Sequence, residues 1–238
     1  MPAAQDLSAT IRDLVIANRI LSREGVVDGF GHISARHPSD PGRYLMSRPR
    51  APELVVEDDI LEFDLDSNPI KPLTISRFSE RFIHGCIYKA RPDVNAVCHN
   101  HAHSLIPYGA TETVMKPILH VASVIGAEVP IWEIREEFGN TNLLVTDNDR
   151  GRSLARALGG GRAILMRGHG ATVAAHSLRA TVYVAVYLMV NAALLREARE
   201  MGEVNYLNSE EIALLDQMNF AEPPLERAWE YWSRRAGY

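Results

Sequence analysis

The chain has 238 residues, a formal net charge of −5, 46% hydrophobic residues and 23% charged residues. This length suits one domain with a substantial core, and the composition is ordinary for a soluble globular protein. The acidic balance, with no dense basic block, argues against a nucleic-acid partner. Two cysteines, Cys86 and Cys98, are too few for a disulfide framework, so we expect a reducing, cytoplasmic compartment.

The N-terminal half of the chain carries alternating helix and strand signals. Apolar residues near helical spacing predict an amphipathic helix over Leu7–Glu24, and Gly29-Phe30-Gly31 predicts a loop after it. Short runs of apolar residues predict strands over Tyr44–Ser47 and Ile60–Leu65. A further helix is expected to end before Pro92, because proline cannot continue a helix.

The C-terminal half is predicted to be richer in helices. Its longest apolar tract, Val182–Leu195, is too short to span a bilayer and contains Asn191, so we interpret it as a buried helix and expect no membrane partner. The expected strands here are Leu143–Val145 and Ala163–Met166, and the expected helices are Arg152–Leu158, Ser177–Arg199, Glu210–Met218 and Pro224–Ala236. This order of elements predicts a single α/β domain in which helices flank a mixed sheet.

Three histidines in two short motifs point to a metal site. His99 and His101 close the run Val-Asn-Ala-Val-Cys-His-Asn-His, and His169 lies between two glycines after a second apolar run. Residues i and i+2 of a strand point to the same face, so His99 and His101 could bind one ion together. Three imidazoles with one open coordination position are typical of a catalytic divalent metal site.

Each of these residues also has a simpler interpretation. A lone His-x-His pair is often two surface or core histidines, and His103, on the same predicted strand face, is an alternative ligand. Glu80 lies near the start of a predicted helix, where a carboxylate could be a capping residue or a catalytic acid or base facing the metal. His84, one turn further along, would ordinarily be a half-buried core or interface histidine.

Several motifs in a fixed order resemble the class II aldolase/adducin family over about residues 7–200. They are Gly31-His32-Ile33-Ser34-Ala35-Arg36, Ser79-Glu80 with His84 and Tyr88, the run from Arg91 to His101, and Arg167-Gly168-His169-Gly170. The resemblance implies one domain over residues 1–238 with a helical tail from about residue 205. It also implies a three-layer αβα fold around a mixed, mostly antiparallel sheet.

The same resemblance implies the functional residues. One divalent metal ion per subunit would be held by His99, His101 and His169, with Glu80 as the catalytic acid or base. Zinc and manganese are the metals we expect first, and iron or cobalt would also suit these ligands. The family's usual assembly is a homotetramer with active sites at subunit interfaces, and we expect the same here.

Two loops depart from the pattern of the sugar-phosphate aldolases. Where those enzymes have Gly-Asn-x-Ser and small residues, this chain has His32, Arg77-Phe78 and Ser47-Arg48-Pro49-Arg50. A phosphate cradle needs small residues that expose backbone N–H groups, and Phe78 would crowd it. An arginine could instead bind a carboxylate with its planar fork, and Arg48 is the first choice.

The chain is more similar to a branch of the family that decarboxylates hydroxylated aromatic or heteroaromatic acids. The stretches that carry this likeness are Gly29–Pro38, Glu80–Gly85, His101–Gly109 and Arg227–Trp232. We therefore expect metal-dependent, non-oxidative decarboxylation of a small aromatic acid such as a dihydroxyphthalate. The residues expected to contact this substrate are Arg48, His32, Ser79, Phe78, His120 and Tyr231.

Two other functions remain open at this stage. A class II sugar-phosphate aldolase or epimerase would use the same histidines and Glu80, so these residues do not separate the two chemistries. The second alternative is a non-catalytic interaction domain like the adducin head. An intact set of three histidines and a glutamate argues against that alternative, because an interaction domain would not need them.

Overall fold

A mixed sheet with the strand order β3-β2-β1-β4-β7-β6-β5 forms the middle of the protein. The computed structural model describes residues 6–72 and 74–238. All neighbouring strands pair antiparallel except β5 and β6, which are parallel. The strands are β1 (His32–Arg36), β2 (Arg43–Ser47), β3 (Ile60–Asp64), β4 (Ala96–Asn100), β5 (Ile131–Trp132), β6 (Ala163–Met166) and β7 (Gly170–Ala175).

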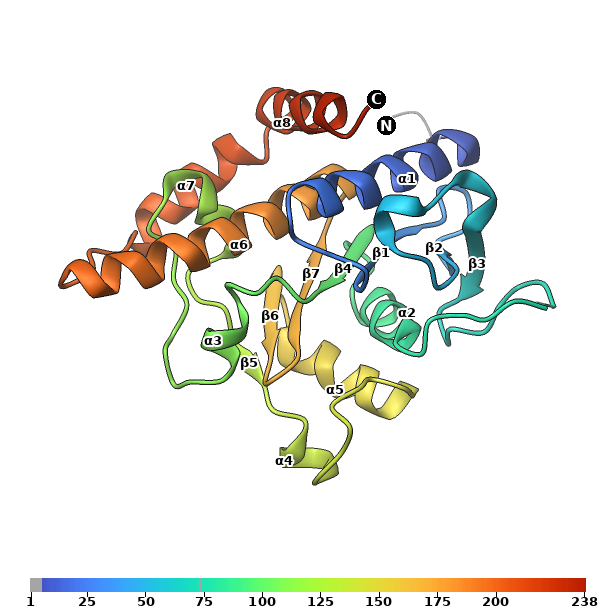
Figure 1. The fold of residues 1–238 in the computed structure, drawn as a ribbon, viewed down its shortest axis with the longest axis horizontal. Helices are drawn as coiled ribbons and strands as arrows, with labels where there is room; N and C mark the ends of the chain where they lie inside the picture. The colour runs from blue at the N-terminus through green and yellow to red at the C-terminus, as the bar shows by residue number, and fades with distance from the viewer. Residues whose placement is uncertain (1–5, 73) are drawn as a thin grey trace.

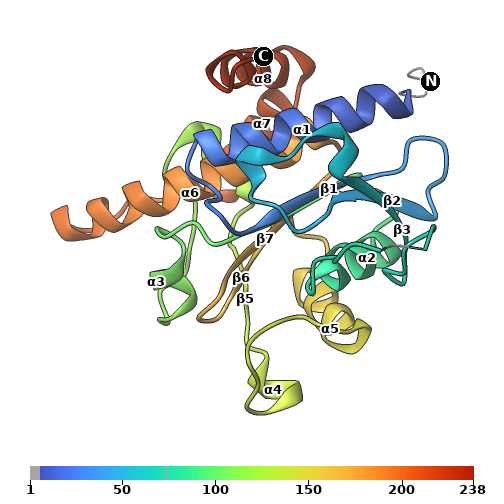
Figure 2. The ribbon, with the colours of Figure 1, turned by 45° about the vertical axis from the view of Figure 1, so that its right-hand side comes forward.

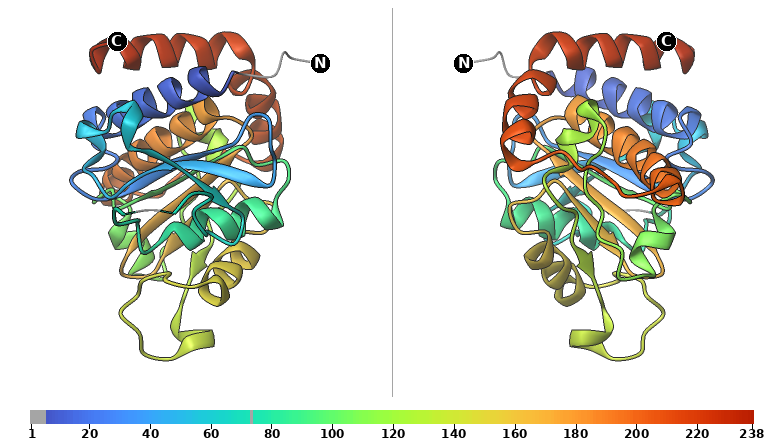
Figure 3. Two further views of the ribbon diagram at one scale, coloured as in Figure 1. Left: turned by 90° about the vertical axis from the view of Figure 1, so that its right-hand side faces the viewer. Right: turned by 90° about the vertical axis from the view of Figure 1, so that its left-hand side faces the viewer.

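Helices cover both faces of this sheet, which confirms the predicted three-layer α/β architecture. One face carries α1, α6 and α8, and the other carries α2 and α5 (Figures 1 and 2). Helix α8 lies across the outer side of α1 (Figure 3). The helices are α1 (Leu7–Arg23), α2 (Arg81–Ala90), α3 (Ile106–Gly109), α4 (Arg135–Phe138), α5 (Asn148–Leu158), α6 (Leu178–Met201), α7 (Ser209–Asn219) and α8 (Glu222–Arg235).

Alternation along the central strands decides which side chains point to each face of the sheet. In β4, Cys98 joins the apolar cluster under α1 and α6, whereas Val97 joins the cluster under α2 and α5. His99 follows Val97 by two residues and therefore points to the α2 face. The same alternation turns Ser34 and His32 of β1 toward α2, because Ile33 and Ala35 pack on the α1 side.

Helix α6 is the apolar tract that the sequence predicts to be buried. Among the described residues it is the one helix long and apolar enough to cross a membrane, but 61% of that window is buried inside the protein. Its polar residue Asn191 is fully buried and bonds the neighbouring loop on two sides. Its Nδ2 donates to the carbonyl of Lys116 at 2.9 Å, and its Oδ1 accepts from the N–H of Ile118 at 2.9 Å.

One predicted strand is wrong, and several short strands are missing from the prediction. Residues Leu143–Val145 form no strand, and Leu143 has a positive φ of 66° that a strand cannot contain. Strands β1 and β7 lie where a loop or no element was expected. Both are short and rich in small or polar residues, so their own pattern is weak, and pairing with β4 on either side stabilises them.

Replacing Asn191 by alanine should destabilise the fold. Asn191→Ala leaves the Lys116 carbonyl and the Ile118 N–H unpaired in a buried position, and each loss costs about 1–3 kcal/mol. We expect the free energy of unfolding to fall by about 2–4 kcal/mol in urea titrations. Glu197→Ala, on the exposed side of the same helix, should change it by less than about 0.5 kcal/mol. Equal losses in both variants would contradict this role of Asn191.

Candidate metal centre

Three imidazoles and one carboxylate converge at the adjoining ends of β4, β7 and α2. Nε2 of His99 lies 3.0 Å from Nε2 of His101. Oε2 of Glu80 lies 3.7 Å from Nε2 of His99 and 3.5 Å from Nε2 of His169. One ligand atom from each of the four residues lies within 4.8 Å of all the others. The structure therefore brings together the residues that the sequence singles out, although they are far apart along the chain.

The two histidines of the His-x-His motif reach the centre in different ways. His99 is the fourth residue of β4 and is fully buried. His101 follows the last residue of the strand, Asn100, whose Oδ1 accepts from the N–H of Ala102 and turns the chain. The same-face argument for a strand therefore holds for His99, whereas His101 is placed by the turn.

Backbone carbonyls hold two of the imidazoles in a form that can bind a cation. Nδ1 of His99 lies 3.1 Å from the carbonyl oxygen of Ala171, and Nδ1 of His169 lies 3.1 Å from that of Leu143. Each Nδ1–H can donate to its carbonyl, which leaves the lone pair of Nε2 facing the centre. Lone pairs and a carboxylate that face one another repel unless a cation lies between them, so this donor set fits a divalent metal ion.

Glu80 is not a helix cap. It occupies the N-cap position of α2, but its side chain bonds no N–H of that helix. Its Oε1 accepts from the N–H of Val145 at 3.0 Å, and its Oε2 faces the histidines. Burial raises the pKa of Glu80, but the imidazoles of His169 and His99, when protonated, outweigh it, so this pKa is lowered. A cation held among neutral imidazoles would favour the ionised carboxylate in the same way.

The segment that sequence analysis mistook for a strand supports the centre. The carbonyl of Leu143 accepts from His169, and two residues later the N–H of Val145 donates to Glu80. The positive φ of Leu143 is what directs both groups inward. Its sequence offers no motif for this function, because backbone atoms make the contacts.

His32, Ser34, His84 and Phe78 line the α2 side of the centre. The His32 ring lies 5.2 Å from the His99 ring and 4.6 Å from the Phe78 ring, measured between centroids. His84 is fully buried behind His32, with its Nε2 2.7 Å from Nδ1 of His32. Burial lowers the pKa of His32, and burial followed by the charge of His99 lowers the pKa of His84 to about 3.

A groove of about 900 Å³ opens beside His101. Its walls come from the loop after α1, the segment after β2 and the middle of α6, and they are largely apolar, with Val26, Val27, Leu54 and Met189 among them. This volume lies within the usual range of small-molecule sites.

Arg48 directly follows β2 and shares a buried carboxylate with Arg50. Nε of Arg48 lies 2.6 Å from Oδ1 of Asp59, and Nη1 of Arg50 lies 2.8 Å from Oδ2. The β1–β2 pairing runs from Arg36 and Tyr44 to Ser34 and Met46, and it stops two residues short of His32 and Arg48. Two guanidinium groups on one carboxylate leave a net positive charge there.

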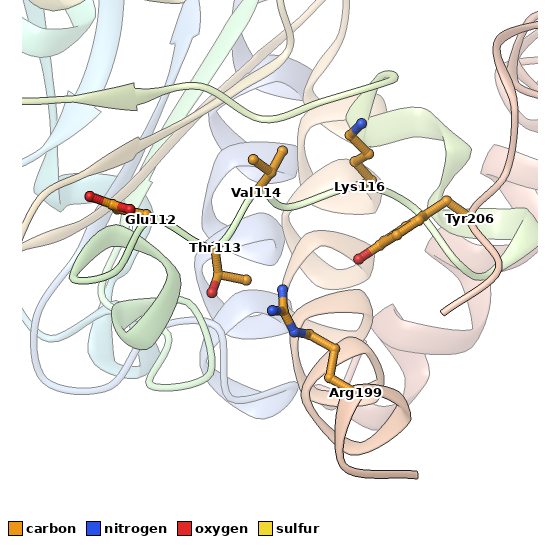
Figure 4. Close-up of a pocket in the computed structure, with 6 residues that line it drawn as sticks. All are labelled: Glu112, Thr113, Val114, Lys116, Arg199 and Tyr206. Atoms are coloured by element: carbon orange, nitrogen blue, oxygen red, sulfur yellow. The ribbon is translucent and has the colours of Figure 1, made fainter. Parts of the chain in front are cut away.

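The remaining predicted substrate residues lie outside this cluster. Ser79 is exposed immediately before Glu80. His120 is exposed at the start of a short 3-10 helix (His120–Ile125), where its carbonyl accepts from Asn219 of α7. Tyr231 is 55% exposed on α8 and its hydroxyl accepts from Arg235. Another hollow, where Arg199 reaches from α6 toward Thr113 (Figure 4), contains none of the predicted residues.

Comparison with known proteins agrees with this fold and this cluster. The model of the "Class II Aldolase and Adducin N-terminal domain" matches residues 12–195. The chain belongs to this family. The matched residues include all four members of the candidate metal centre, Glu80, His99, His101 and His169.

Two proteins that this chain resembles in sequence are named as decarboxylases. The chain is 30% identical to "Decarboxylase tropJ" of Talaromyces stipitatus, with 95% of this chain and 94% of that protein covered. It is 28% identical to "3,4-dihydroxyphthalate decarboxylase" of Arthrobacter keyseri, with 79% and 78% covered. The predicted likeness to the hydroxyaromatic decarboxylase branch is therefore confirmed at the level of sequence.

A solved structure of another member shows the same fold. "L-fuculose 1-phosphate aldolase" from Glaciozyma antarctica superimposes with a TM-score of 0.78 over 99% of this chain and 93% of that chain. The two sequences are 18% identical, so this likeness concerns the fold alone.

Replacing Gly170 should weaken metal binding through His101. A Cβ at Gly170 would overlap the carbonyl oxygen of Asn100 and lie 2.9 Å from Cδ2 of His101. We expect Gly170→Ala to displace that imidazole and lower the affinity for Zn²⁺ by about 10–100-fold in equilibrium dialysis. Gly160→Ala is the matched control, because a Cβ there meets nothing within 4 Å. Unchanged affinity in Gly170→Ala would contradict this packing argument.

The metal-free protein should lose stability in mild acid because of His84. Its folded-state pKa of about 3 lies below its usual value of 6.5. Between these two values the unfolded chain binds more protons than the folded protein, so the free energy of unfolding decreases as the pH is lowered. From pH 6.5 to 5 this contribution amounts to about 2 kcal/mol. Urea unfolding at several pH values should show a weaker pH dependence in His84→Gln. His103→Gln, at an exposed position, should keep the slope of the unsubstituted protein.

Proposed function

We propose that this protein is a metal-dependent, non-oxidative decarboxylase of a hydroxylated aromatic or heteroaromatic carboxylic acid. The observation that carries the proposal is the Glu80–His99–His101–His169 cluster lying beside the aromatic pair of His32 and Phe78. The names of the two relatives support carbon–carbon lyase chemistry of the carboxy-lyase type.

In this proposal His99, His101 and His169 hold one divalent metal ion, and zinc or manganese is expected before iron or cobalt. A bound divalent ion would supply Lewis-acid stabilisation of negative charge on a ring oxygen as carbon dioxide leaves. The three Nε2 atoms are the ligands, because each faces the cluster.

Glu80 is proposed to move the proton. As a carboxylate facing the cluster, it can first accept the proton of a ring hydroxyl and then return it to the ring carbon that loses the carboxylate. Its Oε1 stays bonded to the N–H of Val145, so Oε2 is the oxygen that faces the substrate side.

The surrounding residues are proposed to bind a flat, anionic molecule. The rings of Phe78 and His32 offer apolar faces for an aromatic ring. The net positive charge of Arg48 and Arg50 on Asp59 can attract a carboxylate. Ser79, exposed at the entrance, could donate a hydrogen bond to a ring substituent.

The expected homotetramer and the roles of His120 and Tyr231 stay proposals. Both side chains are exposed and lie outside the cluster of their own chain. If they contact substrate, they do so from another subunit, which is consistent with active sites at subunit interfaces.

Carbon dioxide release by metal-reconstituted protein tests the proposed function. Assays across hydroxyphthalates, hydroxybenzoates and pyridine dicarboxylates should show turnover that a chelator removes and Zn²⁺ or Mn²⁺ restores. Glu80→Gln should retain metal and lose about 10²–10⁴-fold in kcat, because the proton shuttle is missing. His37→Gln, a substitution at a histidine of the β1–β2 turn, is the control and should keep full activity.

Three results would count against the proposal. Full turnover of metal-loaded Glu80→Gln would remove Glu80 from its role. Cleavage of a ketose phosphate without carbon dioxide release from any aromatic acid would favour an aldolase. Protein purified without chelators that contains and binds no divalent metal would favour a non-catalytic interaction domain.

A further inference from the structure

A row of buried side chains runs from the metal centre into the protein beneath α2. Nδ1 of His32 lies 2.7 Å from Nε2 of His84, and Nδ1 of His84 lies 2.6 Å from Oγ of Ser34. Oγ of Ser34 lies 2.7 Å from the hydroxyl of Tyr88. All four side chains are at most 4% exposed. Buried polar groups joined in this way fix one another's orientation.

The hydrogen bonds of this row can run in two directions, which we call the first and the second order. In the first order, Tyr88 donates to Ser34, Ser34 donates to Nδ1 of His84, and Nε2–H of His84 donates to Nδ1 of His32. In the second order every bond is reversed, so Nδ1–H of His84 donates to Ser34, and Ser34 donates to the Tyr88 hydroxyl. Ser34 is the side chain that hydrogen-bonds the Tyr88 hydroxyl. The Val97 backbone also bonds this oxygen, but as a donor, so it cannot accept the hydroxyl hydrogen. The second order therefore leaves a buried hydroxyl hydrogen without an acceptor, which is costly.

The first order determines what His32 presents to the centre. With Nδ1 accepting from His84, a neutral His32 carries its hydrogen on Nε2. The described residues give this Nε2 no hydrogen-bond partner. It is also absent from the set of fully shielded polar atoms that lack a partner, so it is accessible. The His32 ring lies between the rings of Phe78 and His99, so Nε2–H is available to a molecule bound beside the metal ligands.

We propose that Tyr88, Ser34 and His84 are positioning residues that fix His32 as the Nε2–H tautomer. His32 then donates a hydrogen bond to an anionic oxygen of the substrate. The identity of that oxygen, a carboxylate or ring oxygen of an aromatic acid, rests on the proposed function. The tautomer does not rest on it.

The tautomer can be measured on the full-length, metal-free protein. Long-range ¹H–¹⁵N correlation spectra separate a protonated ring nitrogen from an unprotonated one, and the His32→Gln variant identifies the His32 signals. We expect hydrogen on Nε2 of His32 and on Nε2 of His84. Hydrogen on Nδ1 of His32 would overturn the inference, whatever the activity of the protein.

Variants along the row test its effect on substrate. Ser34→Ala removes the donor to His84 and should allow both His32 tautomers, raising KM more than it lowers kcat and reducing kcat/KM by about 10–100-fold at unchanged metal content. Tyr44→Phe is the matched control. The ring of this buried tyrosine contacts Tyr88 and His84, and the substitution keeps that ring, while the hydroxyl it removes bonds Ser67 and the Arg81 carbonyl instead of the row. It should keep both the His32 tautomer and kcat/KM.

The outcomes separate this inference from the proposed function. A shifted tautomer in Ser34→Ala with no change in KM would overturn the substrate contact of His32. An Nε2–H tautomer lost in Ser34→Ala and kept in Tyr44→Phe supports the positioning role even if no aromatic acid is decarboxylated. In that case the proposed function fails and the positioning role stands. If Ser34→Ala does not fold, Tyr88→Phe gives the same comparison, because it removes the hydroxyl hydrogen that disfavours the second order.

Discussion

Mutual repulsion among four converging electron-pair donors is the constraint on which the rest of this site depends. Three Nε2 atoms and Oε2 of Glu80 lie within 4.8 Å of one another, an arrangement that costs free energy unless a cation or a proton lies among them. The backbone carbonyls of Ala171 and Leu143 keep a hydrogen on the far nitrogen of two rings. The fold therefore prepares a cation site and opposes the simplest alternative, in which the rings turn and share protons.

The sheet register brings these donors together across the sequence. His99 pairs with His32 on one side and with Thr172 on the other, so β1, β4 and β7 present one cross-strand row to the α2 face. A one-residue slip would turn every member to the opposite face. Ile33, Cys98 and Val173 pack on the opposite face, under α1 and α6, and this apolar packing holds the register and thereby the site.

The sequence predicts the long helices, and it singles out the four residues that the structure brings together, because both have strong local signals. Helix α6 shows a long apolar pattern, and the histidines lie in short motifs. Strands β1 and β7 have weak patterns of their own and depend on pairing with β4. The 143–145 segment acts through its backbone, which any sequence possesses, so no residue type signals its contacts with His169 and Glu80.

The departures from the aldolase pattern gain a structural explanation when they are considered together. An asparagine in place of His32 would have a shorter side chain, and its amide could present either the oxygen or the nitrogen. His32 instead continues a row of hydrogen bonds that ends at Tyr88. Phe78 packs against His32 where a phosphate cradle would need exposed N–H groups. In the proposed arrangement His32 adds a fixed hydrogen-bond donor and Phe78 adds an apolar face. A flat anion would use both features, whereas a phosphate group would use the donor and be crowded by the Phe78 ring.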